Sequence, residues 1–184
     1  MVVKSIGEGL EQVLDKAVTR KPPQSVGAQA RFLVEKLKST KAAADLLGVS
    51  PRTVQRYLKG EITHPRAKVA GQLKEEVRKR WQPKVKERAK KQAAARGLMI
   101  DIRANLGYVA DERKTDQARD RHITIALSPA SAERIFAAQG DTEDRMRQAV
   151  AESLRQDYFQ QGGTRAAGLD EIRMNNLHNV EFGL

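Results

Sequence analysis

Residues 40–60 have the sequence TKAAADLLGVSPRTVQRYLKG, in which two helical patterns are separated by a glycine. In the first pattern, Ala44 and Leu47 fall on one helical face. Gly48 can adopt the positive φ that a tight turn requires. Ser50 then supplies a side-chain oxygen that can cap the second helix. This order predicts a helix-turn-helix.

The second helix of this motif, residues 51–59, has an apolar face and a basic face. Val54 and Tyr57 recur at packing positions, while the cations fall on another side. Because arginine can form paired hydrogen bonds with guanine, and glutamine with adenine, we expect this helix to read the major groove of DNA. The alternative is a small helical hairpin whose basic face is only solvated. The expected DNA contacts are Arg52, Thr53, Gln55, Arg56 and Lys59.

The charge of the 184-residue chain is unevenly distributed. Residues 1–96 contain 23 Lys and Arg against 9 Asp and Glu, whereas residues 97–184 contain 11 against 14. The basic half is therefore expected to bind a polyanion. The chain has no cysteine, which excludes disulfides and thiolate metal sites and is compatible with a reducing compartment. No apolar run approaches about 18 residues and no signal-peptide pattern opens the sequence, so we expect a cytoplasmic protein without a membrane partner.

Composition and prolines divide the chain into four expected segments. Residues 1–27 form an amphipathic helix opened by Ser5, followed by a proline-containing linker. Residues 28–82 form the helix-turn-helix domain, and residues 97–184 a second domain. Between them, residues 83–96 form a basic helix or connector that has almost no apolar stripe and is either solvated or laid along DNA phosphates. The expected phosphate contacts outside the motif are Arg66, Lys84, Lys86, Lys90 and Lys91.

From Gly97 onward the hydrophobic period changes from 3.6 to 2, which is typical of half-buried strands. Two helices are expected between the second and third strands, the later one with Tyr158 facing inward. The predicted fold class is α+β: an N-terminal helical helix-turn-helix domain followed by a smaller α/β domain with a short sheet backed by helices. A ribbon-helix-helix reader, which would have to dimerise, is the alternative for this second domain. The expected strands cover 98–103, 121–127 and 180–184, and the expected helices cover 129–139 and 142–160.

The motifs of common enzyme classes are absent from the sequence. There is no phosphate-binding glycine loop, no GxSxG elbow and no His-Glu-x-x-His pair. His64, His122 and His178 lack the spacing of metal ligands, so we expect surface or packing roles for them and no metal site. The spacing of Asp101 from Asp111 gives only a weak indication of Mg²⁺ binding.

A polar connection, residues 104–120, is expected to form an exposed loop between the first two strands. Its only Ser or Thr hydroxyl belongs to Thr115. From the residues alone, Thr115 is an ordinary loop residue or a helix N-cap. Tyr108 lies near the end of the preceding strand, where a packing role is expected.

Several stretches along nearly the whole chain resemble one family, the telomere terminal proteins of linear Streptomyces-type chromosomes and plasmids. The helix-turn-helix alone is unspecific, but its combination with the other stretches and the chain length is specific. The matching stretches are 26–33, the motif through Arg56-Tyr57, 77–83, 106–108, 121–127, 158–163 and 180–182.

The resemblance implies a protein that becomes covalently joined to the 5′ end of linear DNA. A threonine hydroxyl replaces the RNA primer in this family, and the matching position is Thr115, although this chain has Lys114-Thr115 where relatives carry adjacent threonines. Tyr108 is the alternative nucleophile. A hydroxyl needs activation, which a polymerase can supply with its own metal ions, so the chain itself is expected to be no enzyme.

The same resemblance implies the partners. These are telomeric DNA ends with a single-stranded overhang or a hairpin, a telomere-associated adaptor protein and a DNA polymerase. No cofactor of its own is expected, since Mg²⁺ arrives with the polymerase and the dNTP, and the protein is expected in the nucleoid at replicon ends. A homodimer is left open. The main alternative is a helix-turn-helix repressor or plasmid replication protein that binds duplex DNA without covalent linkage, and another is an enzyme that makes the linkage by itself.

Overall fold

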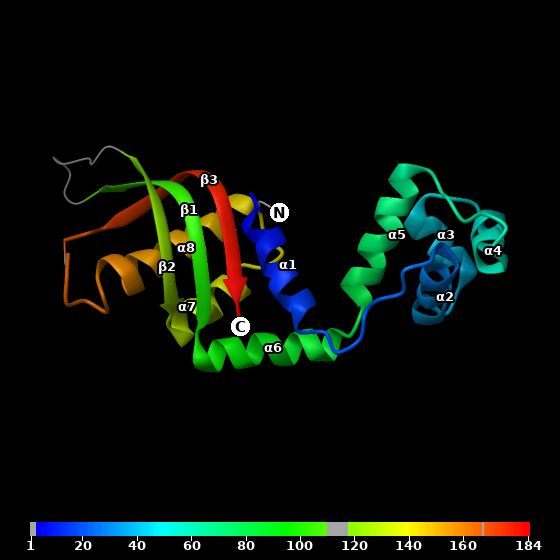
Figure 1. Ribbon diagram of the computed structural model, residues 1–184, viewed down its shortest axis with the longest axis horizontal. Coiled ribbons are helices and arrows are strands. Elements are labelled where there is room, and N and C mark those ends of the chain that lie inside the picture. The colour runs from blue at the N-terminus through cyan, green and yellow to red at the C-terminus, as the bar shows by residue number, and fades with distance from the viewer. Residues whose placement is uncertain (1–2, 110–117, 167) are drawn as a thin grey trace. The chain divides into compact units, whose positions relative to one another are not determined.

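The computed structural model describes residues 3–109, 118–166 and 168–184, and within them the chain has an α+β fold (Figure 1). The α+β class predicted from the sequence is therefore confirmed. The helices are α1 (Ile6–Lys16), α2 (Val26–Leu37), α3 (Thr40–Leu47), α4 (Pro51–Lys59), α5 (Ala67–Arg80), α6 (Pro83–Arg96), α7 (Pro129–Ala137) and α8 (Glu143–Leu154), which continues as a π-helical turn, η1 (Arg155–Phe159). The strands are β1 (Leu98–Val109), β2 (Arg119–Leu127) and β3 (Glu171–Gly183).

The chain divides into two compact units whose boundaries differ from the four expected segments. We call Val18–Val85 the basic unit, and Met1–Ala17 together with Lys86–Leu184 the sheet unit. The sheet unit is thus built from both ends of the chain. The opening helix, which was expected in a segment with the linker that follows it, belongs to the same unit as the C-terminal sheet.

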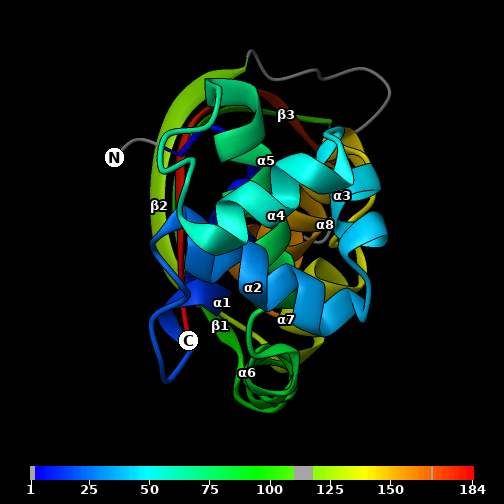
Figure 2. The same cartoon turned by 90° about the vertical axis from the view of Figure 1, so that its right-hand side faces the viewer.

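The basic unit is a bundle of α2, α3, α4 and α5, in which α2 contacts each of the other three helices (Figure 2). Its core is formed by fully buried apolar side chains at helical spacing, such as Leu33, Leu47, Val54 and Leu73. Trp81 packs its ring edge-to-face on Phe32, with ring centroids 5.1 Å apart. The fluorescence of Trp81 therefore reports on the folding of the basic unit.

The sheet unit has an antiparallel sheet of order β2-β1-β3, with α1, α7 and α8 packed on one face (Figure 1). Alternate residues of β1 point into this core, and Ile100 and Ile102 are fully buried. The sheet is made within one chain. The ribbon-helix-helix alternative, which needs strands from two chains, is not what the sequence adopts here.

The strands are longer than expected, and the predicted loop 104–120 is wrong at both ends. β1 continues to Val109, and β2 begins at Arg119. The inward alternation of β1 simply continues, because Ala104 is fully buried and Leu106 is 1% exposed. Because Ala104 has a small side chain, the hydrophobic pattern of the sequence did not indicate that the strand continues.

The N-terminal helix α1 is held in the sheet unit by apolar burial and by a cap from a distant residue. Ile6 and Leu10 are fully buried in the core shared with the sheet. The Glu143 carboxylate, at the start of α8, accepts hydrogen bonds from Ile6 N (2.7 Å) and from Ser5 Oγ (2.8 Å). A carboxylate at a helix N-terminus satisfies free N–H groups and interacts favourably with the helix dipole.

Helix α6 was expected to have almost no apolar stripe and not to be packed deeply, and this expectation is wrong. Ala89 and Ala93, one turn apart, are buried in the core of the sheet unit. The helix then turns into β1 through Gly97, whose φ of +95° and close approach to the Leu127 carbonyl leave no room for a Cβ. Within the described part of the chain, no helix is both long and apolar enough to span a bilayer.

Tyr158 was expected to face inward on the last helix, but it is 39% exposed. The reason is the change from α-helix to the wider π-helical turn η1, which shifts the side chains that follow. Phe159 instead packs against the core, with the Arg121 guanidinium 5.5 Å from its ring centroid.

Candidate nucleic-acid interface

The helix-turn-helix forms as the sequence predicts, and local interactions explain its shape. Gly48 ends α3 with a φ of +62°. The Ser50 Oγ accepts a hydrogen bond from Thr53 N (3.2 Å) and caps α4, and Pro51 occupies the first turn. Gly60 then ends α4 with a φ of +75°. All of these contacts are local, so the motif could be predicted from the sequence.

Helix α4 presents four of the expected DNA contacts to solvent. Val54 and Tyr57 are buried against the bundle. The fifth expected contact, Thr53, is half-buried, and its hydroxyl lies 2.9 Å from Ser50 Oγ, so it serves the helix start. The exposed contacts are Arg52, Gln55, Arg56 and Lys59.

Arg56 has one acidic partner on its own unit. Its Nε lies 3.2 Å from the Glu61 carboxylate, and both side chains are about half exposed. An ion pair this exposed contributes little to stability. The guanidinium can therefore exchange Glu61 for a phosphate or a base edge at small cost.

A cavity of about 490 Å³ lies beside the end of α4, between it and the start of α2. Its cationic lining residues are Arg31 and Lys59, and His64 stands beside them. Its described lining contains no Asp or Glu. Sequence reasoning included Lys59 but missed Arg31, because the two residues come together only when α2 packs on α4. Arg66, the other expected contact in this region, is exposed just before α5.

The division into two units sharpens the charge asymmetry of the sequence. The basic unit contains 16 Lys and Arg against 5 Asp and Glu, a net charge of +11. The sheet unit contains 18 of each, a net charge of zero. The whole excess charge of the chain thus belongs to the unit that carries the helix-turn-helix, which is the electrostatic pattern of a polyanion-binding module.

The expected phosphate contacts on α6 differ from one another in the structure. Lys84 and Lys91 are exposed, whereas Lys90 is half-buried. Lys86 forms an ion pair with Asp15 of α1, which occupies its ammonium group. Arg88, which sequence reasoning did not include, is exposed. At helical spacing, Arg88 falls outside the face formed by Ala89 and Ala93. The sequence could therefore have identified it as an exposed cation.

Thr115, the expected priming residue, lies outside the described residues. The strands on either side of it are described, and β1 and β2 are paired up to Leu106 and Arg119. Tyr108, the alternative nucleophile, lies within β1 and pairs with Ile172 of β3. In the sequence, Thr115 falls between these two strands.

The face of the sheet opposite the helices carries two acid–histidine pairs. The Asp101 carboxylate accepts a hydrogen bond from Thr124 Oγ1 and lies 3.0 Å from His122 Nε2. The Thr124 hydroxyl is the main reason that the pKa of Asp101 is below its usual value, and His122 acts in the same direction. These side chains are one-third or more exposed, so His122 is a surface residue, as expected.

The second pair joins all three strands. The Asp120 carboxylate accepts a hydrogen bond from Asn105 Nδ2 (3.0 Å) and lies 3.2 Å from His178 Nε2. The Asn105 amide is the main cause, and His178 the next, of a lowered pKa for Asp120. In residues 3–109, 118–166 and 168–184, no group of three or more His, Asp or Glu side chains could hold a metal ion.

The fold and the exposed basic helix define a class: an α+β protein with a helix-turn-helix unit of high positive charge. Compared with protein-family models, with curated proteins and with solved structures, the chain shows no match. The function is therefore argued from the residues and their geometry.

Proposed function

We propose that the protein binds the ends of linear DNA and serves as a protein primer, becoming covalently attached to the 5′ end through the hydroxyl of Thr115. The observation that carries the DNA-binding part is the exposed basic face of α4 in a unit of net charge +11. The priming part rests on the likeness to telomere terminal proteins. In the sequence, Thr115 falls between the described strands β1 and β2, and a segment between strands can present a hydroxyl to a partner.

The two units have different roles in this proposal. The basic unit holds DNA by contacts of α4 in the major groove and by phosphate contacts from the surrounding cations. The neutral sheet unit presents Thr115 beside the held end. Holding two reactants together lowers the entropic barrier of their reaction, so the protein contributes positioning.

The chemical step is a nucleotidyl transfer. The Thr115 oxygen attacks the α-phosphorus of a dNTP, the bond from that phosphorus to the bridging oxygen of the β-phosphate breaks, and pyrophosphate leaves. The hydroxyl proton passes to a base in the polymerase site or to water. A polymerase supplies the metal ions that activate the hydroxyl, so Mg²⁺ enters with the polymerase and the dNTP. The product is a nucleotide joined through its α-phosphate to the Thr115 oxygen, and its free 3′-hydroxyl primes DNA synthesis.

The polymerase follows from this step. The telomeric end, with a single-stranded overhang or a hairpin, and the telomere-associated adaptor protein follow from the likeness to telomere terminal proteins. The protein would act in the cytoplasm, at the replicon ends within the nucleoid.

The test is transfer of a labelled nucleotide to the protein. The chain is incubated with labelled dCTP, a polymerase and a telomeric single strand, and is then denatured and separated. We expect label on the parent chain and on Thr115→Ser, and none on Thr115→Ala. Tyr108→Phe is the matched control and should label like the parent.

Each other outcome selects a different function. Label on Thr115→Ala but not on Tyr108→Phe would move the nucleophile to Tyr108. Label without added polymerase would make the chain an enzyme. Absence of label from the parent, together with tight binding of duplex DNA, would support a repressor or plasmid replication protein that uses the same α4 face.

A further inference from the structure

Strand β3 is an edge strand whose outer side is open over its first part. The sheet order β2-β1-β3 gives it β1 as its neighbour on one side. On the other side, Val180 N donates a hydrogen bond to Val3 O (2.9 Å). Between Glu171 and Asn179, the described residues provide no further backbone partner for this side. Unpaired N–H and C=O groups at a sheet edge can accept another strand.

The regular part of this edge is short and well defined. β3 pairs with β1 without interruption from Glu171 to Met174. The register shifts twice further along, where β3 passes Asn105 and Ala104 of β1. Because bulges twist an edge away from a new neighbour, an added strand can pair only along Glu171–Met174.

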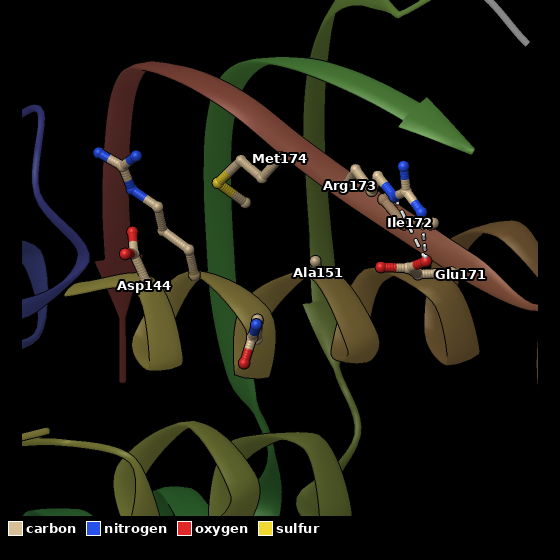
Figure 3. A pocket seen from close by; sticks show the side chains of 8 residues that line it. Asp144, Ala151, Glu171, Ile172, Arg173 and Met174 are labelled. Carbon is tan, nitrogen blue, oxygen red and sulfur yellow. Dashed lines mark hydrogen bonds and ion pairs between the residues drawn. The ribbon is translucent and has the colours of Figure 1, made fainter. Parts of the chain in front are cut away.

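A groove of about 290 Å³ runs beside this stretch, between α8 and β3 (Figure 3). Figure 3 shows Ala151 on the upper side of α8, with Met174 on the strand above. Ile172 completes the apolar part of the lining, and Asp144 on α8 stands near one end. A helix beside an open strand edge is the arrangement in which proteins commonly add an extended segment to a sheet.

The groove is lined by equal numbers of acidic and basic side chains. Its lining contains two acids, Asp144 and Glu171, and two arginines, Arg147 and Arg173. The exposed Glu171 and Arg173 side chains lie on the same face of β3, with the Arg173 guanidinium 3.2 Å from the Glu171 carboxylate. The sheet unit as a whole has no net charge. Such a surface neither attracts a polyanion nor repels a copy of itself.

A two-fold arrangement uses this charge pattern directly. In an antiparallel pair centred on Ile172, Glu171 of each copy lies opposite Arg173 of the other. Two opposite-charge cross-strand pairs then form, and the Ile172 and Met174 side chains of both copies cover the two grooves. A symmetric dimer requires a surface of this kind, which is complementary to itself.

We propose that two copies of the chain pair through the β3 edge at Glu171–Arg173, centred on Ile172, to form a continuous six-stranded sheet. The α8 helices of both copies then lie on the same face of that sheet, with the shared apolar cluster next to them. This inference is independent of the DNA-end function.

Analytical ultracentrifugation of the full chain tests the proposal, at protein concentrations from micromolar to several hundred micromolar. The buffer should contain about 0.3 M salt, so that repulsion between the two basic units is screened. We expect a concentration-dependent dimer. Glu171→Arg and Arg173→Glu should each raise the dimer dissociation constant about tenfold or more, since each places like charges opposite one another in two pairs. The double variant Glu171→Arg with Arg173→Glu should restore dimerisation, and Glu181→Arg, an exposed reversal further along β3, should leave it unchanged.

Because the chain has no cysteine, disulfide trapping gives a second measurement. Under mild oxidation, Ile172→Cys should form a covalent dimer, since Cβ atoms of residues directly opposite in an antiparallel pair come within reach of a disulfide. The more exposed Asn176→Cys should not. A chain that stays monomeric at every concentration, a double variant that fails to restore the dimer, or equal trapping at positions 172 and 176 would each overturn the proposal.

Discussion

Replacing Leu10 with alanine tests whether the two ends of the chain form one folding unit. Leu10 is fully buried in the cluster that α1 shares with the sheet. At such a site a Leu→Ala change removes the transfer free energy of the side chain and leaves a cavity, which costs about 3–5 kcal/mol. Spread over a unit of this size, that loss corresponds to a drop in Tm on the order of 10–20 °C.

Two probes separate the units in this experiment. The only tryptophan, Trp81, lies in the basic unit and packs on Phe32, so its fluorescence follows that unit. Hydrogen exchange of β1, measured by mass spectrometry during thermal or urea unfolding, follows the sheet unit. We expect Leu10→Ala to destabilise the sheet unit and to leave the Trp81 transition in place. Leu33→Ala, at a fully buried site of the basic unit, should give the reverse pattern.

The exposed Lys16→Ala change at the end of α1 serves as the surface control, with an effect within about 0.5 kcal/mol. The reasoning is refuted if Leu10→Ala shifts the Trp81 transition while β1 exchanges as in the parent. In that case α1 would belong energetically to the basic unit, as its position next to it in the sequence suggests.

Three further predictions concern DNA binding and pH. Arg52→Ala and Arg56→Ala should each weaken duplex binding by about 1–3 kcal/mol in fluorescence anisotropy, and equal affinity to the parent would exclude α4 as the reading helix. Arg88→Ala with Lys91→Ala should lower the slope of log K against log salt by roughly 0.9 for each phosphate that the protein no longer neutralises, while an unchanged slope would mean that α6 does not touch DNA. The pKa of Glu152 is lowered from about 4.5, chiefly by the hydrogen bond from Arg155, so its contribution to stability is present above that pH and is lost as the pH falls through the lowered value. Glu152→Gln should therefore reduce stability at pH 7 and flatten its loss as the pH falls below about 4.5, and identical pH profiles of Tm for variant and parent would contradict this linkage.

Short-range patterns were enough to predict much of the basic unit. Ser50, Gly48 and Gly60 act on the chain within a few residues of themselves, through a cap and two left-handed turns. The outward cations of α4 follow from helical spacing alone, because Val54 and Tyr57 fix the buried face. A prediction of this kind succeeds when the interactions that decide a structure are local.

The sheet unit was predicted only in part, because its contacts join distant residues. The alternation of Ile100 and Ile102 indicated a strand. The end of β1, however, depended on the burial of Ala104, whose small side chain contributes little to the hydrophobic pattern of the sequence. The expected loop 104–120 was too long, since pairing between strands decided where β1 ends and where β2 begins.

The sequence by itself determined the helix-turn-helix, the outward cations of α4 and the order of strands and helices, since caps, turn glycines and hydrophobic period act over a few residues. Only the tertiary structure decided that α1 joins the C-terminal sheet, that Ala89 and Ala93 bury one face of α6, and that Lys86 is engaged by Asp15. These outcomes depend on apolar surface and charges brought together from opposite ends of the chain. The same assembly assigns the whole net charge of +11 to one unit and none to the other.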